Sequence, residues 1–213
     1  MTAAPGPEVF GIPNGQFAQN SWLVVDPASR DTVVVDPGEE AERILAEIRR
    51  RDLVVRAIWL THAHLDHIWG VDTVRVATGA PVHLHPDDRR WYDILPEQGA
   101  MFGLRDLPRL APPDHELAHG DSVSVGRFPF VVRHVPGHSP GHVAFIGHGL
   151  AIAGDVLFAG SIGRTDLAGG STEALLESIR RELLTLPDET RVLPGHGPET
   201  TVGAERRSNP FLR

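Results

Sequence analysis

Four potential metal ligands lie within six residues of the chain, directly after the apolar run at residues 57–60, which predicts a β-strand. They are His62, His64, Asp66 and His67. The side chains at positions 62 and 64 point the same way only in an extended chain, whereas those at 66 and 67 come where a helix is expected to begin. The turn between strand and helix can therefore direct all four side chains into one pocket. Imidazoles and a carboxylate are ligands that suit zinc, iron or manganese.

Three more candidate ligands each follow an apolar run that predicts a strand: His138, Asp155 and His196. Because sites in α/β folds gather at the carboxyl ends of strands, we expect four strand ends to converge on one pocket. Seven donors are too many for one tetrahedral ion, but they suit two adjacent ions with Asp155 between them. Two cations about 3.5–4 Å apart can share a bridging water that becomes hydroxide near neutral pH, and they can polarise a carbonyl group. The seven residues therefore predict a hydrolytic site with two divalent ions.

The composition excludes several other kinds of chemistry. The chain has no cysteine, which rules out disulfides, thiolate nucleophiles and zinc sites built on sulfur. Its 20 basic residues are all arginines, which rules out a Schiff-base or P-loop lysine, and its net charge of −8 disfavours a nucleic-acid partner. No apolar run approaches the roughly 20 residues of a membrane helix, and residues 1–8 lack the basic start and apolar core of a secretory signal. We expect a cytoplasmic protein with no membrane partner.

The hydrophobic pattern predicts one mixed α/β domain over residues 1–213, with strands and helices in alternation. A hairpin is predicted from strands at 22–25 and 32–35, followed by an amphipathic helix at 39–51 and a strand at 54–60. A helix at 66–77 and a short strand at 82–84 come next, and residues 121–153 are predicted to be rich in strands. A final helix is expected at 172–186 and a final strand at 191–193. The segment 86–117 is predicted to be a helical and loop excursion that forms a wall of the pocket.

Two segments imitate functional motifs. Residues 83–88 resemble the first ligand cluster, but a proline followed by an aspartate at 86 and 87 is typical of a helix start, which favours a structural role. Residues 137–141 match the G-x-S-x-G elbow of serine hydrolases, in which the residue after Ser139 must donate its amide N–H. Pro140 has no N–H, and a strand rather than a helix is predicted after it, so we expect no serine nucleophile. His134 and His142 either orient ligand imidazoles or are ordinary strand residues, and we expect the latter.

Taken together, these motifs resemble those of the metallo-β-lactamase-fold hydrolases. The matching elements are Thr-His-x-His-x-Asp-His at 61–67, Pro-Gly-His at 136–138, Gly-Asp at 154–155 and Pro-Gly-His at 194–196. The resemblance implies a four-layer αββα sandwich with two mixed β-sheets and the metals at one edge. It also implies that His62, His64 and His138 hold one metal ion, that Asp66, His67 and His196 hold the other, and that Asp155 bridges them. The implied cofactors are two divalent ions per chain, zinc first, with iron or manganese as alternatives, and Asp66 and Asp155 are the implied catalytic residues.

Within this superfamily the segments 154–167 and 200–211 look most similar to the short glyoxalase II-like branch, whose members resemble hydroxyacylglutathione hydrolase. That resemblance implies hydrolysis of a small-molecule thioester such as S-lactoylglutathione through a metal-bridging hydroxide. Asp155 and the absence of cysteine argue against hydrolysis of β-lactam antibiotics. Only residues 197–213 follow the last ligand, so the carboxyl-terminal helical domain that binds glutathione in full-length glyoxalase II is not expected.

Three alternatives remain open from the sequence. The element Gly-Arg-Thr-Asp at 163–166 is also similar to one in the persulfide dioxygenases, which share this fold but use a single iron ion. A hydrolase of other esters or of lactones would use the same ligands. A metal-binding module without catalysis would keep the ligands but need no open cleft. The sequence leaves the metal, the acyl and thiol parts of the substrate, the substrate-binding residues and the oligomeric state open.

Overall fold

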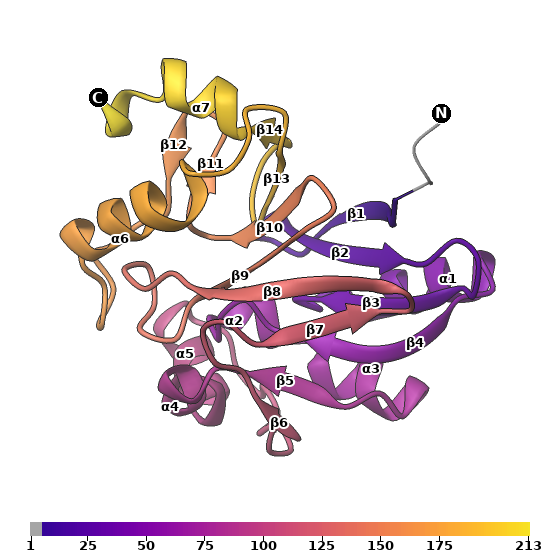
Figure 1. Cartoon of the computed structure of the whole chain (residues 1–213). Helices are drawn as coiled ribbons and strands as arrows, with labels where there is room; N and C mark the ends of the chain where they lie inside the picture. Colours follow the sequence, from indigo (N-terminus) through magenta and orange to yellow (C-terminus); the bar gives the residue numbers. More distant parts are fainter. Residues whose placement is uncertain (1–5) are drawn as a thin grey trace.

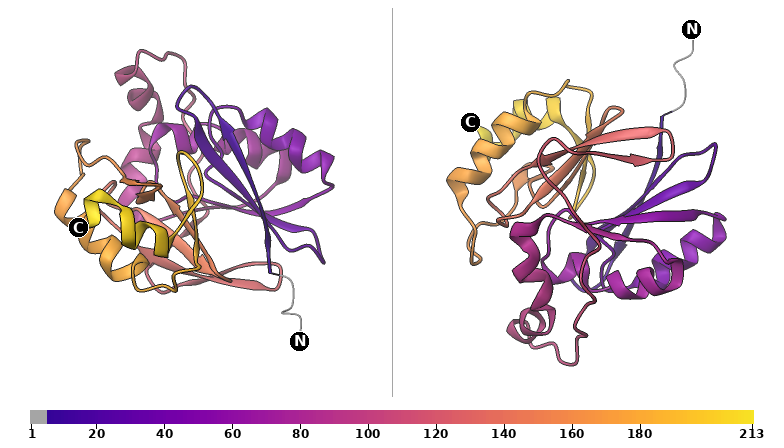
Figure 2. Two further views of the ribbon diagram at one scale, coloured as in Figure 1. Left: turned by 90° about the horizontal axis from the view of Figure 1, so that it is seen from above. Right: turned by 60° about the horizontal axis from the view of Figure 1, so that its bottom comes forward.

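Two six-stranded sheets pack face to face, and helices cover their outer sides (Figure 1). The computed structural model describes residues 6–213, so the prediction about a secretory signal falls largely on residues outside this range. Figure 2 shows the amino-terminal helices, in purple, and the carboxyl-terminal helices, in orange and yellow, on opposite outer sides of the two sheets. This four-layer arrangement confirms the predicted αββα sandwich.

The first sheet is built from the amino-terminal half of the chain, and its strands follow one another in sequence order. They are β1 (Glu8–Asn14), β2 (Gln19–Val25), β3 (Asp31–Val35), β4 (Val54–Trp59), β5 (Val82–Leu84) and β6 (His115–Glu116). The pairs from β1 to β3 are antiparallel, and those from β3 to β6 are parallel, so the sheet is mixed. The helical segments of this half are α1 (Ala41–Arg50), α2 (Leu65–Ile68), α3 (Val71–Thr78), η1 (Pro86–Asp88), α4 (Arg89–Asp93) and α5 (Leu95–Met101).

The second sheet comes from the carboxyl-terminal half, in the spatial order β14-β13-β10-β9-β8-β7. Its strands are β7 (Ser122–Val125), β8 (Phe128–His134), β9 (Val143–Gly147), β10 (Leu150–Gly154), β13 (Arg191–Pro194) and β14 (Thr200–Thr201). The pair of β10 with β13 is parallel and the others are antiparallel. A small separate ribbon pairs β11 (Leu157–Phe158) with β12 (Ser161–Ile162), and the helical segments are α6 (Thr172–Ser178), η2 (Ile179–Leu183), α7 (Val202–Ser208) and η3 (Pro210–Leu212).

Alternation along the strands explains why both faces of each sheet are covered. In β2, Leu23 packs with the helices of the first half, while its neighbour Trp22 packs between the two sheets. In β10, Ile152 faces the space between the sheets and Ala151 faces the outer helices of the second half. Because successive side chains of a strand point to opposite faces, an apolar run of this kind can fill two cores at once.

Helix α1 confirms the amphipathic helix predicted at 39–51, since Ile44, Leu45 and Ile48 are buried on one side. The helix predicted at 66–77 is wrong as a single element, because it breaks at Gly70 into α2 and α3. A side chain at Gly70 would overlap the carbonyl oxygen of Gly38, and the Gly70 N–H donates to the Pro37 carbonyl over 2.9 Å. The close approach of residues 37–38 therefore ends the first helix after one turn.

The helix predicted at 172–186 begins as expected, where the Ser171 hydroxyl accepts a hydrogen bond from the Ala174 N–H. It then widens into the π-helical turn η2 and ends at Leu183, earlier than predicted. The hairpin, the strand at 82–84, the strand-rich segment 121–153 and the final strand are all confirmed. Strand β1 and helix α7 are additional elements that the sequence did not predict.

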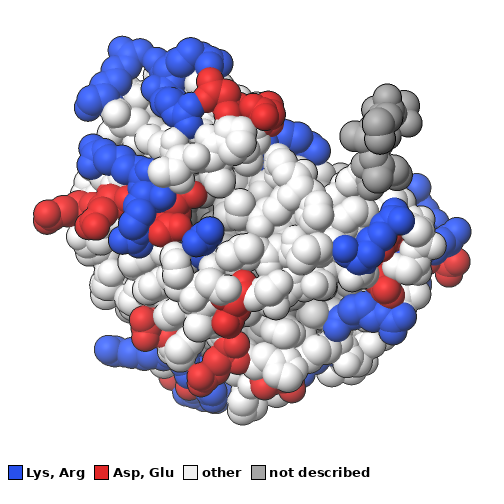
Figure 3. Space-filling model, in the orientation of Figure 1, with Lys and Arg blue, Asp and Glu red and all other residues white. Residues whose placement is uncertain are grey.

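Charged side chains of both signs are interspersed on the face drawn in Figure 3, mostly toward its periphery. Near the carboxyl terminus, for example, Arg206 and Arg207 both pair with Asp188. Across residues 6–213, no helix combines the length and the hydrophobicity that crossing a membrane would need.

Candidate metal centre

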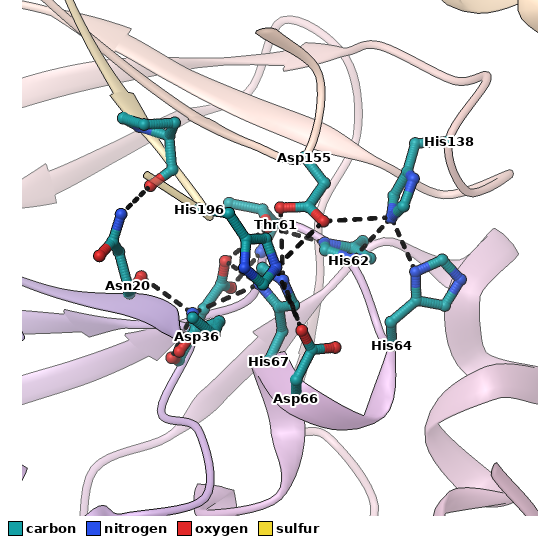
Figure 4. A network of polar contacts seen from close by, with 12 residues as sticks. Asn20, Asp36, Thr61, His62, His64, Asp66, His67, His138, Asp155 and His196 are labelled. Carbon is teal, nitrogen blue, oxygen red and sulfur yellow. Dashed lines mark hydrogen bonds and ion pairs between the residues drawn. The ribbon is translucent and has the colours of Figure 1, made fainter. Parts of the chain in front are cut away.

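All seven predicted ligand side chains meet at one edge of the sandwich, where loops from both halves converge (Figure 4). The segment after β4 supplies His62 and His64, and the short helix α2 supplies Asp66 and His67. The second half supplies His138 from the loop between β8 and β9, Asp155 after β10 and His196 after β13. The structure therefore brings together every residue of the predicted set. That these residues bind ions stays a prediction.

Three histidines form one compact group of donors. The Nε2 atom of His138 lies 2.8 Å from Nδ1 of His64 and 3.2 Å from Nε2 of His62. Asp155 Oδ2 lies 3.5 Å from the same His138 nitrogen. Ligand atoms about 2.0–2.1 Å from a tetrahedral zinc ion are about 3.4 Å from one another, so these spacings are close to those of a filled coordination shell.

A second group of donors lies on the other side of Asp155. The Nε2 atom of His196 is 3.1 Å from Asp66 Oδ2, and the Nε2 atom of His67 is 3.7 Å from that same oxygen. Asp155 Oδ1 lies 3.4 Å from His67 Nε2, while Asp155 Oδ2 lies 3.4 Å from His196 Nε2. The Asp155 carboxylate thus contacts donors of both groups, as a bridging ligand would.

Two buried atoms at the centre of the site have no hydrogen-bond partner. They are His67 Nε2 and Asp155 Oδ1, and each belongs to a side chain that is 10% exposed or less. Leaving a buried polar atom unpaired costs about 1–3 kcal/mol, so such atoms mark a position that suits a ligand. A divalent cation between them would satisfy both, and the residues present therefore fit the metal ions that the sequence predicts.

The electrostatics of the first group also suit a cation. Burial lowers the pKa of His64 to about 3, and burial together with neighbouring imidazoles holds the pKa of His62 well below its ordinary value. Both rings are therefore neutral at pH 7, and neutral imidazole is the form that binds metals.

In the second group, the carboxylates of Asp66 and Asp155 determine the direction in which the pKa values of the histidines shift. Burial alone would lower the pKa of His67, but the charges of Asp155 and Asp66 outweigh burial and raise that pKa well above its ordinary value. Burial is likewise outweighed at His196, where hydrogen bonds to Asp155 and Asp66 raise the pKa to about 9. The negative field that holds protons on these rings would attract a divalent cation equally.

The other ring nitrogen of several ligands is held by the protein. His138 Nδ1 lies 2.8 Å from the carbonyl oxygen of Arg164, and His196 Nδ1 lies 3.1 Å from that of Phe17. His67 Nδ1 lies 3.0 Å from Asp36 Oδ2. Such contacts fix the orientation and tautomer of a ligand imidazole.

Sequence reasoning missed two residues beside the ligands. Asp36 is buried and also accepts hydrogen bonds from the N–H and hydroxyl of Thr61, over 2.7 and 2.6 Å. It follows the apolar end of β3, so the strand-end pattern that identified the ligands could have found it. His142 was expected to be an ordinary strand residue, which is wrong: its ring stacks on His62 at 4.7 Å, and its Nε2 accepts the Asp155 N–H over 3.0 Å.

The structure does not form the serine-hydrolase elbow. Ser139 is buried in the loop between β8 and β9, and its hydroxyl group donates a hydrogen bond to the Asp88 carboxylate. Another candidate group of donors combines His85 and Asp87, from the segment 83–88 that imitates the first ligand cluster, with His134 at the end of β8. Its two imidazole rings stack almost parallel, at 8° and 4.3 Å, so their in-plane lone pairs do not converge on one ion.

A cavity of about 360 Å³ opens onto the ligands. Its floor contains five of the ligand side chains, and its walls are mainly apolar: Phe17, Leu65, Phe102, Phe158, Ile162 and Leu167. Gln98 and Phe102, from the segment 86–117, also line the cavity. The cavity provides the open cleft that catalysis needs.

The chain is similar in sequence and in fold to several known proteins. Residues 14–196 match the sequence profile of the Metallo-beta-lactamase superfamily. The hydroxyacylglutathione hydrolase GloC of Haemophilus influenzae is 40% identical over 204 residues, which are 94% of this chain and 96% of that protein. The crystal structure of the BLEG-1 B3 metallo-beta-lactamase is 41% identical with a TM-score of 0.91, covering 96% of this chain and 99% of that one. The crystal structure of TTHA1623 in a di-iron-bound form is 43% identical in sequence, has a TM-score of 0.88, and covers 95% of this chain and 100% of that one.

Proposed function

This chain belongs to the metallo-β-lactamase superfamily and is a metallo-hydrolase of that fold, and we propose that it cleaves small thioesters with two divalent ions. The observation that carries the proposal is the position of Asp155. Its two carboxylate oxygens contact donors of both groups, at 3.4–3.5 Å, and one of them is buried without a partner. The di-iron form of TTHA1623 supports a centre with two ions.

Each of the seven candidate ligands has a role in the proposed reaction. His62, His64 and His138 would hold one ion, and Asp66, His67 and His196 the other, with Asp155 shared between them. Such ions lower the pKa of water and polarise a carbonyl group. Asp66 also lines the cavity and keeps 17% of its side chain exposed, so it is placed to exchange a proton with water or with the departing thiol.

The cavity walls favour a substrate with an apolar arm. Three phenylalanine rings face the cavity, and Phe17 and Phe102 make an edge-to-face contact at 5.4 Å. Among the described residues that line it, Arg164 is the one cationic side chain besides the histidines, and it already pairs with Asp166 over 2.7 Å. The similarity to GloC supports an S-acylglutathione as the first substrate to test, whereas the walls favour an apolar acyl group on it.

Steady-state hydrolysis of thioesters tests the proposal. We expect metal-loaded protein to cleave S-lactoylglutathione and S-phenylacetylglutathione at the same rate in air and under strict anaerobic conditions. The phenylacetyl ester should have the higher kcat/KM because its ring meets the apolar walls. No cleavage of either ester by protein that contains two ions per chain would contradict the proposal.

The same preparation separates two other functions. Similarity to BLEG-1 favours β-lactam hydrolysis as a second candidate, and a chromogenic cephalosporin measures it directly. The dioxygenase alternative predicts oxygen uptake with glutathione persulfide and iron-loaded protein. Either activity exceeding thioester cleavage would replace the assignment to thioesters. We expect little oxygen uptake, because a single-iron enzyme would not need the complete second donor group. We expect little cleavage of the cephalosporin, because the presence of Asp155 argues against β-lactam hydrolysis.

A further inference from the structure

Asp88 is a buried carboxylate that the proposed chemistry does not use. It ends the short helix η1, which follows strand β5 of the first sheet, and its exposed fraction is 0%. An aspartate at the start of a helix ordinarily caps that helix by accepting a backbone N–H. Asp88 stands at the start of α4 but makes no such bond to it. Its carboxylate is directed elsewhere.

The Asp88 carboxylate joins two loops that come from different halves of the molecule. One oxygen, Oδ2, accepts the N–H of Ala63 over 2.8 Å. The other oxygen, Oδ1, accepts the N–H of Gly141 over 2.6 Å and also the hydroxyl of Ser139. Each loop is therefore held by a separate oxygen of one side chain.

Both loops carry ligands of the three-histidine group. Ala63 lies between His62 and His64, and Ser139 directly follows His138. The second donor group has no residue within this set of contacts; its His67 is held by Asp36 instead. Asp36 also accepts from Thr61, which precedes His62, so it borders both groups, whereas the contacts of Asp88 are confined to the loops of the three-histidine group.

The backbone around Asp88 is built for this contact. A Cβ atom at Gly141 would lie 2.5 Å from the Asp88 backbone nitrogen and 2.9 Å from its Cβ atom, so only glycine allows the loop to approach so closely. Pro140 has no N–H that would need an acceptor there. The loop between β8 and β9 is therefore shaped to reach Asp88, next to α4 (Figure 1).

We propose that Asp88 is a positioning residue that sets the geometry of the three-histidine ion site by tying the loop of His62 and His64 to the loop of His138. The proposal rests on the ion binding proposed above and not on the substrate. An Asn at position 88 keeps the shape but offers only one carboxamide oxygen. The N–H groups of Ala63 and Gly141 cannot then both find an acceptor, and the loops lose their common anchor.

Cobalt binding measured site by site tests this role. Asp88→Asn is combined with His196→Ala, which leaves the three-histidine site, and separately with His64→Ala, which leaves the other site. We expect Asp88→Asn to weaken cobalt binding at least tenfold in the first background, with a changed visible absorption spectrum, and less than threefold in the second. Losses of 10- to 100-fold are typical when a contact that orients a metal ligand is removed.

Two further variants complete the test. Asp87→Asn alters the adjacent, exposed carboxylate and should bind cobalt as the parent does in both backgrounds. Ser139→Ala keeps both backbone N–H bonds to Asp88 and should weaken cobalt binding two- to threefold at the three-histidine site only. If Asp88→Asn does not fold, this variant tests the role of Asp88 in its place. Equal losses at both sites, or none at either, would overturn the role of Asp88. If the unmutated protein binds no cobalt, the proposed ion binding fails instead.

Discussion

Asp155 is the single residue on which the proposed two-ion chemistry depends most. Replacing it with Asn keeps the size of the side chain, so we expect Asp155→Asn to fold normally. A neutral amide bridges two cations poorly and leaves the pKa of bound water higher. Because removing an outer contact already costs 10- to 100-fold, we expect kcat for thioester cleavage to fall by more than about 100-fold. The measurement is kcat together with metal content by elemental analysis; a rate close to that of the wild type would remove Asp155 from the mechanism.

Gly195 precedes the ligand His196 and shows why a small residue belongs in that motif. A Cβ atom there would overlap Asp155 Oδ1 and lie 2.7 Å from Cε1 of His67. The loop cannot move away easily, because the carbonyl of Gly195 accepts the N–H of Asn20 in the other sheet over 2.7 Å. We therefore expect Gly195→Ala to destabilise the fold by about 1–3 kcal/mol and to lower the metal content. Urea unfolding checks the first effect; Gly197→Ala is not a suitable control, because Gly197 has a positive φ of 74°.

Among individual residues, the sequence predicts the candidate ligands well and the residues that hold them poorly. The ligands share one recognisable feature, since each lies just past a predicted strand. Asp36 shares that feature, but no histidine lies near it in the sequence. Asp88 contacts residues 25 and 51 positions away, at Ala63 and Ser139, and spacing along a chain carries no information about such contacts.

Among the elements, helix α5 links the excursion at 86–117 to the first ligand loop. Its Gln98 is buried, accepts the N–H of Leu65 over 3.1 Å and donates to the carbonyl oxygens of Ala63 and Trp91 over 2.9 and 2.8 Å. Gln98→Leu would leave these backbone groups unpaired at about 1–3 kcal/mol each, partly relieved by relaxation. We expect the free energy of unfolding to fall by about 2–4 kcal/mol, as measured in urea.

The neighbouring Glu97 provides the matched control for Gln98. Its carboxylate pairs with Arg109 on the surface, with 49% of the side chain exposed. Exposed pairs contribute about 0–1 kcal/mol, so Glu97→Leu should change the stability little. A similar loss in both variants would mean that the helix, and not the Gln98 side chain, accounts for the effect.

The elements that the sequence predicts are those with strong periodicity. Helix α1 has four buried apolar residues at spacings of three and four, and the hairpin has two runs composed mainly of β-branched and aromatic residues. Strand β1 contains Gly11 and Pro13, which break the strand pattern, yet seven residues of it pair with β2. Helix α7 has two turns, and its start depends on the Thr201 hydroxyl accepting the Ala204 N–H. Pairing and capping of this kind are decided by the rest of the fold.

Over the whole molecule, each donor group draws ligands from both halves of the sandwich. His62 and His64 come from the first half and His138 from the second; Asp66 and His67 come from the first half and His196 from the second. An ion in either group would therefore join the two sheets at their shared edge. Ion binding and the stability of the whole fold should be coupled, because the ligands come together only in the folded chain.

Removal of the ions should accordingly lower the melting temperature as well as abolish turnover. An ion present at 100 times its dissociation constant stabilises the folded state by about 2.7 kcal/mol, so two such ions contribute about 5 kcal/mol. For a chain of this length, 1 kcal/mol corresponds to roughly 2–4 °C. We expect dialysis against a chelator to lower Tm by about 10–20 °C in calorimetry, and the addition of zinc to restore both Tm and thioester cleavage. Equal Tm values with and without chelator, with the metal content shown to differ, would contradict this coupling.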